Sequence, residues 1–405
     1  MQLKKNISKI FINKNINLLF AGQLISQMGD SMFIIGLMWL VLEITGSKAT
    51  MGTVAMVSYL PMLFFGLFAG VLVDTFNRKK IMLAADLLRA LIVLIIPVTY
   101  FLNVISIPII IFTAFGLSTL TAFFNPARDA VIPFLVQEKN LLKANSLIQG
   151  SNYIAILLGP GLAAAVISVI DVVPLFTIDS ITFILSFSLI LIISYSPTHV
   201  LQKEKLNVVV HLKEIISYIN KEKRVRYLLM LTAVNNFFIM GPAIVGIPIF
   251  VKDVLHKGAS SYALVESSYG LGMLLGVVLI HFLIRYINLG KILLIGMMFD
   301  GITFAVVYFT RSIELMIMLI SFHAIGIPFI VVARTSLIQK WVESEKLGRA
   351  FSLVNIAVVG MTALTTGVTG LLAEYISIQE IFAIFGTAGM LCGIAGLFYK
   401  QLRSG

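Results

Sequence analysis

The sequence predicts an all-α integral membrane protein whose twelve transmembrane helices form two six-helix bundles. Of its 405 residues, 59% are hydrophobic and only 12% are charged, whereas a soluble domain carries roughly 25% charged residues. Apolar runs of about 20 residues, the length that crosses a bilayer core, recur twelve times between charged or turn-forming clusters. The longest polar stretch separates six of these runs from the other six.

The twelve expected helices fall into two halves with a polar segment between them. We predict an N-terminal bundle over 1–195, a cytoplasmic linker over 196–225 and a C-terminal bundle over 226–405. The expected spans lie near 17–42, 50–73, 81–101, 105–126, 142–170, 173–194, 227–251, 262–284, 291–309, 313–338, 348–373 and 379–399. The lysine-rich start lacks a small-residue cleavage signature and runs into a full-length span, so we interpret it as a retained first helix.

The distribution of positive charge orients the helices. With an even number of spans both termini share one side, and 25 of the 30 Lys and Arg residues fall on that side. Basic residues concentrate in cytoplasmic loops, so both termini are expected in the cytoplasm of a multi-pass protein of the cell membrane. The net charge of +11 is spread through short loops beside apolar helices, which favours lipid headgroups as partners and predicts no nucleic-acid partner.

The two halves carry signs of an internal repeat, which many transporter folds contain. Glycines four residues apart on a helix face permit close packing between membrane helices, and such pairs occur in the second and eighth spans. At an offset of 206 residues the matches are Gly66 with Gly272, Gly70 with Gly276, and Ala127–Arg128 with Ala333–Arg334.

The short loop between the second and third spans holds an acid and a basic cluster. Asp74 ends one expected helix, and Arg78, Lys79 and Lys80 begin the next. Opposite charges at these helix ends can pair with each other or with neighbouring helix ends. Asn77 can adopt the left-handed conformation that such a tight turn can require.

This loop resembles the signature loop of the major facilitator superfamily. Gly70, Asp74, Arg78 and Lys79 match it, whereas Thr75 replaces a basic residue and Asn77 replaces a glycine. The resemblance implies a cytoplasmic gate in which Asp74 and Arg78 latch helix ends together, with Arg128 at the end of the fourth span. The second half has no acid aligned with Asp74, so the latch is asymmetric.

A proline in the fifth span adds to the resemblance. Gly159 and Pro160 match the centre of a motif found in the antiporters of the superfamily, and the proline predicts a helix bend. With Gly29–Asp30 in span one and Asn125–Pro126–Ala127 ending span four, the chain resembles the macrolide-efflux branch of drug exporters. The resemblance implies proton-driven export of a small amphipathic substrate by alternating access.

Ionisable residues at membrane depth are functional candidates because they are costly there. Asp30 in span one and Asp300 in span nine are the proton-coupling candidates; for Asp30 a structural hydrogen bond is the alternative. Asp86 and Arg89 lie three residues apart on one helix face, and we favour a structural or gating pair over a proton site.

Three further polar residues in the spans are assigned no chemistry. Asp179 and Glu266 lie nearer the outer face, where water can reach them, and His323 is interpreted as a packing residue.

The sequence lacks the motifs that are typical of other function classes. The chain contains no Gly-x-x-x-x-Gly-Lys-Ser/Thr phosphate loop and no His-x-x-x-His pair. We therefore expect neither an enzyme nor a metal or other cofactor. We expect the proton gradient to supply the energy for transport. We expect a monomer. An importer or a lipid or metabolite carrier of the same fold remains open, as does a channel. The 29 Phe and 17 Met suit an apolar substrate, whereas a sugar importer would favour more polar central helices.

Overall fold

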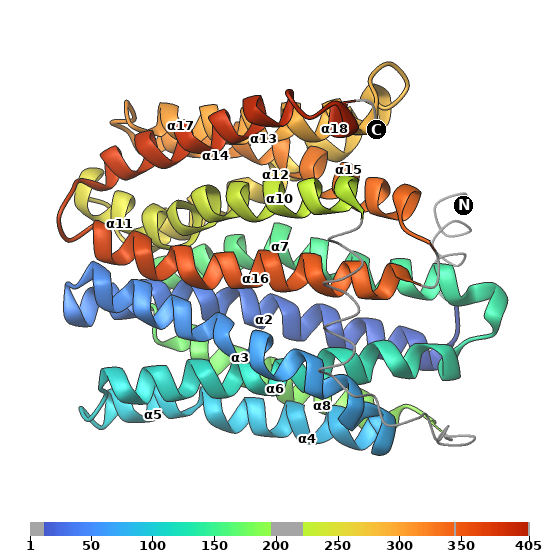
Figure 1. The fold of residues 1–405 in the computed structure, drawn as a ribbon. Coiled ribbons are helices and arrows are strands. Elements are labelled where there is room, and N and C mark those ends of the chain that lie inside the picture. The colour runs from blue at the N-terminus through green and yellow to red at the C-terminus, as the bar shows by residue number, and fades with distance from the viewer. Residues whose placement is uncertain (1–11, 196–221, 344–345, 404–405) are drawn as a thin grey trace, which may run out of the picture. The chain divides into compact units, whose positions relative to one another are not determined.

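The computed structural model describes residues 12–195, 222–343 and 346–403. Within these ranges every regular element is helical, and twelve helical segments are long and apolar enough to cross a membrane (Figure 1). The predicted fold class and the number of spans are therefore confirmed. The lysine-rich start and most of the predicted linker lie outside the described residues.

The chain forms two compact units, and two of the boundaries between them lie inside helices. One unit comprises Met1–Leu37 with Pro61–Leu206, and the other comprises Met38–Leu60 with Asn207–Gly405. The first two helices, α2 (Lys14–Thr45) and α3 (Lys48–Thr75), each contribute to both units. The sequence-based division at residues 195 and 226 stays a prediction.

In the first unit, α4 packs against both α6 and α8. Its remaining elements are α4 (Arg78–Val93), α5 (Ile95–Phe101), α6 (Ile107–Leu135), η1 (Glu138–Asn140), α7 (Leu141–Val169) and α8 (Pro174–Ile192). The turn before α4 differs from expectation. Asn77 has a φ of −65°, so the turn does not use the left-handed conformation that asparagine tolerates. Its side chain instead accepts a hydrogen bond from the Lys80 N–H and caps the helix.

In the second unit, α13 packs against α15 and α17, α10 against α16, and α12 against α14. After α10 (Lys223–Gly241) the seventh span continues through two π-helical segments, η2 (Pro242–Gly246) and η3 (Phe250–Val254), on either side of α11 (Ile247–Ile249). The remaining helices are α12 (Ala259–Leu283), α13 (Leu289–Val307), α14 (Ile313–Ala324), α15 (Gly326–Trp341), α16 (Leu347–Leu372), α17 (Ile378–Gly396) and α18 (Lys400–Arg403).

Two spans are interrupted where a proline removes a backbone hydrogen bond. Pro97 and Pro328 lack the N–H that would bond to the carbonyl four residues earlier. Those carbonyls belong to Val93, the last residue of α4, and Ala324, the last residue of α14. The third and tenth spans are therefore each built from two helices.

The glycine pairs of the predicted repeat differ in their surroundings. A methyl group on Gly272 or Gly276 of α12 would clash with the backbone at Ser321 or Ile325, so the predicted close packing is confirmed there. A methyl group on Gly66 of α3 would meet only the sulfur of Met62, in the same helix and 4.0 Å away, among the described side chains and neighbouring helices. Close packing at Gly66 is therefore not found among the described residues.

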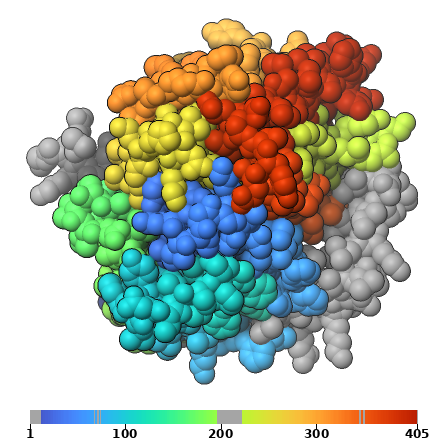
Figure 2. Space-filling view, turned by 90° about the vertical axis from the view of Figure 1, so that its left-hand side faces the viewer, coloured from blue at the N-terminus to red at the C-terminus, as the bar shows by residue number. Residues whose placement is uncertain are grey.

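Within the second unit, the turn between α2 and α3 is held by polar contacts. Figure 2 shows this blue turn beside yellow and red segments of the second half. The Glu374 carboxylate accepts hydrogen bonds from the Ala49 N–H and the Ser47 hydroxyl, both at 2.9 Å, and Lys48 pairs with Asp253 at 2.9 Å. The hydrogen bonds from Ala49 and Ser47 lower the pKa of Glu374.

Candidate functional site

A polar cavity of about 230 Å³ lies within the first unit. Side chains from α2, α4, α6 and α7 line it, and most of them carry hydrogen-bonding groups. The polar lining residues are Gln23, Ser26, Gln27, Asp30, Arg89, Thr121, Asn125, Arg128, Gln149 and Asn152. A cavity with this lining binds polar groups rather than an apolar ligand body.

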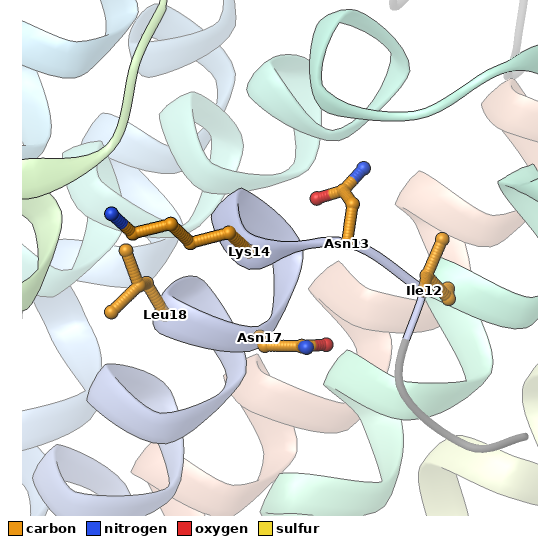
Figure 3. Close-up of a pocket in the computed structure, with 5 residues that line it drawn as sticks. All are labelled: Ile12, Asn13, Lys14, Asn17 and Leu18. Carbon is orange, nitrogen blue, oxygen red and sulfur yellow. The ribbon is translucent and has the colours of Figure 1, made fainter. Parts of the chain in front are cut away.

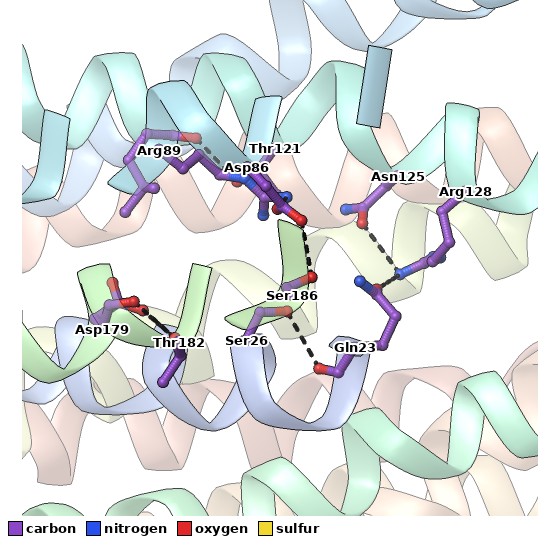
Figure 4. Close-up of polar contacts among 11 residues, drawn as sticks. Gln23, Ser26, Asp86, Arg89, Thr121, Asn125, Arg128, Asp179, Thr182 and Ser186 are labelled. Carbon is purple, nitrogen blue, oxygen red and sulfur yellow. Dashed lines mark hydrogen bonds and ion pairs between the residues drawn. The ribbon is translucent and has the colours of Figure 1, made fainter. Parts of the chain in front are cut away.

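One wall of the cavity is organised around Arg128. Its Nη1 donates to Gln23 Oε1 at 3.0 Å and to Asn125 Oδ1 at 3.1 Å, and Figure 4 shows both amides turned toward the guanidinium. Its Nη2 lies 2.8 Å from the exposed Asp129 carboxylate. Gln23 is buried, and its Nε2 has no hydrogen-bond partner among the described residues. Arg128 therefore holds the Gln23 amide in place through the amide oxygen.

The predicted pair of Asp86 and Arg89 is present and fully buried. The two side chains form a direct hydrogen-bonded ion pair, and the Ser186 hydroxyl donates to the second oxygen of Asp86 at 2.8 Å. The Arg89 guanidinium lies over the rings of Phe124 and Phe183, 4.1 and 4.6 Å from their centroids. These contacts fix the guanidinium, although its Nε lacks a partner among the described residues.

A third acid joins this cluster, contrary to the sequence interpretation. Asp179 of α8 is completely buried, so the interpretation that water reaches it is wrong. The side chains of Asp179 and Thr182 face Gly29 of α2, where a methyl group would clash with both. Gly29 thus lets α8 approach α2 beside Asp30, which lines the cavity within electrostatic reach of Asp86 and Arg89.

The acids of this region outnumber their basic partner. Asp30, Asp86 and Asp179 interact electrostatically with the guanidinium of Arg89. We refer to these four residues as the first polar cluster. Its charges balance only when protons neutralise two of the three carboxylates, because uncompensated charge is costly in an apolar interior.

The predicted gate residues are only partly described. The Asp74 side chain lies outside the described part of the chain, so its pairing with Arg78 stays a prediction. Arg78 donates to the Ala130 carbonyl at 3.3 Å and lies 4.8 Å above the Phe134 ring. The basic part of the loop thus contacts the last turns of α6.

The Gly159–Pro160 motif lies within one continuous helix, α7. A methyl group on Gly159 would approach the Cβ of Ser31 to 2.6 Å, so this glycine permits contact between α7 and α2. The Ser31 hydroxyl donates to the Gln27 carbonyl within its own helix at 3.0 Å. The predicted bend at Pro160 stays a prediction.

The second unit contains a separate polar cluster around Asp300. The sequence analysis assigned His323 to packing, but its Nε2 lies 3.1 Å from Asp300 Oδ1, and both side chains are buried. The Thr303 hydroxyl donates to the Phe299 carbonyl at 2.8 Å and lies 2.9 Å from His323 Nδ1. We refer to Asp300, Thr303 and His323 as the second polar cluster.

The contacts of His323 depend on which ring nitrogen carries the proton. The Thr303 hydroxyl has a single hydrogen and is 2.8 Å from the Phe299 carbonyl as well as 2.9 Å from Nδ1. On the other side of the ring, Asp300 Oδ1 lies 3.1 Å from Nε2 but has no hydrogen-bond partner among the described residues. The carboxyl and the imidazole are therefore neighbours at a distance over which a proton can be exchanged.

Aromatic rings enclose this second cluster. The Phe304 ring stacks on the imidazole of His323 with 4.0 Å between centroids, and Tyr269 meets it edge-on at 5.8 Å. The buried Asn235 amide lies near Asp300, and Glu266 lies on the same helix as Tyr269. Among described residues the cluster has no Lys or Arg ion pair.

A polar stripe in the sixth span could have revealed Asp179. Asp179, Thr182 and Ser186 are spaced three and four residues apart, which places them on one face of an otherwise apolar helix. His323 has no comparable local signal, because Asp300 and Thr303 lie on a different helix.

A second hollow opens at the start of α2, where Figure 3 shows Asn13, Lys14 and Asn17 among its lining residues. It adjoins the undescribed residues 1–11 and contains none of the candidate residues.

Comparisons with known proteins agree with this architecture. The family model described as "transmembrane secretion effector" matches residues 10–405. The chain is 25% identical to macrolide efflux protein A of Streptococcus pyogenes, over 95% of this chain and 96% of that protein. It is 27% identical to macrolide efflux protein A of Enterococcus faecalis, over 74% and 94% respectively. The crystal structure of the nucleoside transporter NupG shares the fold, with a TM-score of 0.77, 12% identity, and coverage of 94% of this chain and 98% of that one.

Proposed function

Since the chain belongs to the transmembrane secretion effector family of the major facilitator superfamily, and is thus a multi-pass membrane transporter, we propose that it exports amphipathic compounds such as macrolides in exchange for protons. The two macrolide efflux relatives support the direction and the substrate class. Both termini lie in the cytoplasm of a cell-membrane protein that acts as a monomer. No cofactor takes part, and the proton gradient drives transport.

The observation that carries proton coupling is the excess of carboxyl groups in the first polar cluster. Three acids share one guanidinium, and of the three only Asp30 lines the cavity. Asp30 therefore exchanges its proton with the cavity, while Asp86 stays bound to Arg89 and Ser186. Asp300 is the second coupling candidate, in its pair with His323.

The cytoplasmic gate supplies the second element of the proposal. Asp74 and Arg78 latch the cytoplasmic helix ends, and Arg128 joins the cavity wall to the end of α6. Breaking and re-forming the latch opens and closes the cavity toward the cytoplasm. Gly159 and Pro160 provide the bend in α7 that accompanies this movement.

Efflux of a macrolide and of a cationic dye from cells expressing the chain, with and without a protonophore, tests the proposal. We expect extrusion that the protonophore abolishes. In proteoliposomes, Asp30→Asn should retain substrate binding but lose at least about tenfold of its pH-gradient-driven uptake, since the amide cannot carry the proton. Glu138→Gln, which alters an exposed carboxylate that does not line the cavity, is the matched control.

Two results would contradict the proposal. Full gradient dependence in Asp30→Asn would place the coupling proton elsewhere. In the same assay Asp74→Asn should slow transport, and a wild-type rate in well-folded Asp74→Asn protein would rule out the latch.

A second candidate function is favoured by the polar lining of the cavity. A carrier of polar metabolites would use such a lining for its whole substrate. Uptake of sugars or hydroxy acids by the same cells, without macrolide extrusion, would support this alternative.

A further inference from the structure

We propose that the cavity of the first unit binds a neutral polyhydroxylated head group, of the kind that a sugar presents, on the exported compound. This inference rests on the proposed export function, which it deepens by naming the part of the substrate that the cavity recognises. It goes against the expectation of an apolar, Phe- and Met-lined site.

The size of the cavity supports a head group rather than a whole drug. Pockets for drug-sized ligands measure roughly 300 to 1,000 Å³, and this cavity measures about 230 Å³. Among its lining residues only Phe124 and Ile148 are hydrocarbon side chains. The apolar body of an amphipathic compound therefore lies elsewhere, and a single polar ring fills the available space.

Amide groups that reach the cavity show what the head group must supply. Gln149 and Asn152 of α7 line the cavity and are both exposed. Each amide carries hydrogen-bond donors and an acceptor. A ligand hydroxyl can therefore both accept from and donate to these side chains.

Neutral hydroxyl groups fit the charged side chains of the cavity better than an ionic head group does. The guanidinium groups of Arg89 and Arg128 oppose a cationic head group, while the Asp30 carboxylate opposes an anionic one. A hydroxyl accepts from the amide of Gln149 or Asn152 and donates to Asp30, so neighbouring hydroxyls satisfy both kinds of partner. The cavity is therefore suited to a neutral head group with several hydroxyls.

The position of Asp30 in the cavity also links binding of the head group to binding of the proton. An ionised Asp30 accepts a hydrogen bond from a ligand hydroxyl, and a protonated Asp30 has lost part of that acceptor capacity. Proton and head group therefore compete for the same carboxylate, which is the relation that exchange of substrate for proton requires.

Three soluble one-ring sugars, of which one is neutral, one cationic and one anionic, test the inference directly. Binding of methyl glucoside, glucosamine and glucuronate to the full chain in lipid nanodiscs is measured by saturation-transfer NMR, with empty nanodiscs as the blank. We expect methyl glucoside to bind most tightly. Gln149→Met and Asn152→Leu should each weaken its binding about tenfold.

Ser146→Ala changes an exposed polar residue of α7 that does not line the cavity and should bind as the wild type does. Gln149 and Asn152 are both exposed at the cavity, so replacing either one leaves no buried polar group unpaired. The two independent variants keep the test informative if one of them fails to fold.

Each other outcome overturns the inference. Tighter binding of glucuronate or of glucosamine would show that the cavity selects an anion or a cation. Absence of binding by all three sugars, or equal binding in all variants, would show that the cavity takes no such head group. Macrolide efflux is measured separately, so its persistence alongside a failed sugar test would leave the export function standing.

Discussion

The two polar clusters solve the problem of a buried acid in different ways. In the first cluster, three carboxyl groups gather around one guanidinium beside a cavity. In the second, one carboxyl group faces one imidazole under aromatic rings. The first cluster needs a permanent positive charge, whereas the second reaches neutrality by holding a proton. The difference suggests that one site exchanges protons with the cavity and the other holds its proton more firmly.

The largest effect is expected from removing the permanent charge of the first cluster. Arg89→Met leaves the Asp86 carboxylate buried without its partner, which costs about 3 to 5 kcal/mol for a buried ion pair broken on one side. We expect little folded protein, measured as thermal unfolding and monodisperse yield in detergent. The double variant Asp86→Leu/Arg89→Met should recover most of the loss. Equal stability of Arg89→Met and the wild type would mean that the guanidinium does not hold this cluster together.

A smaller effect is expected in the second cluster, because its acid can keep a proton of its own. His323→Phe removes one partner of Asp300 while preserving an aromatic ring between Phe304 and Tyr269. The loss of stability should be about 1 to 3 kcal/mol, as for a buried polar group left without its hydrogen bond. Thermal unfolding measures it.

The double variant Asp300→Leu/His323→Phe sharpens the comparison. It should regain stability but not the wild-type dependence of transport on pH, because no exchangeable proton remains at the site. Unchanged pH dependence in this variant would make the second cluster purely structural and leave Asp30 as the coupling acid.

The same contrast explains how much the sequence could predict. The spans follow from composition and length, and the Asp86–Arg89 pair follows from helix periodicity, since its partners lie three residues apart. Asp300 and His323 lie on α13 and α14, so only their packing brings them together. Local spacing cannot reveal a partner on another helix.

Local sequence patterns could not predict the cavity either. Its amides lie on three helices, each of which is mostly apolar: Gln23 is on α2, Asn125 on α6, and Gln149 and Asn152 on α7. The composition of the whole chain, rich in Phe and Met, favoured an apolar site because it averages over the lipid-facing residues. Exposed Phe and Leu side chains on α4 and α6, such as Leu91 and Phe112, account for part of that average.

The smallest effect is expected at the turn between α2 and α3, where the acid is exposed and one of its oxygens accepts two hydrogen bonds. Hydrogen bonds from Ala49 and Ser47 lower the pKa of Glu374, so its contribution is present above the unfolded-state pKa and is lost as pH falls through the lower folded-state pKa. Glu374→Gln should destabilise the protein by less than about 1 kcal/mol at neutral pH, given its solvent exposure. The difference between variant and wild type in thermal unfolding should shrink on acidification. A difference that instead grows toward low pH would mean that the protonated carboxyl, and not the carboxylate, holds this turn against α16.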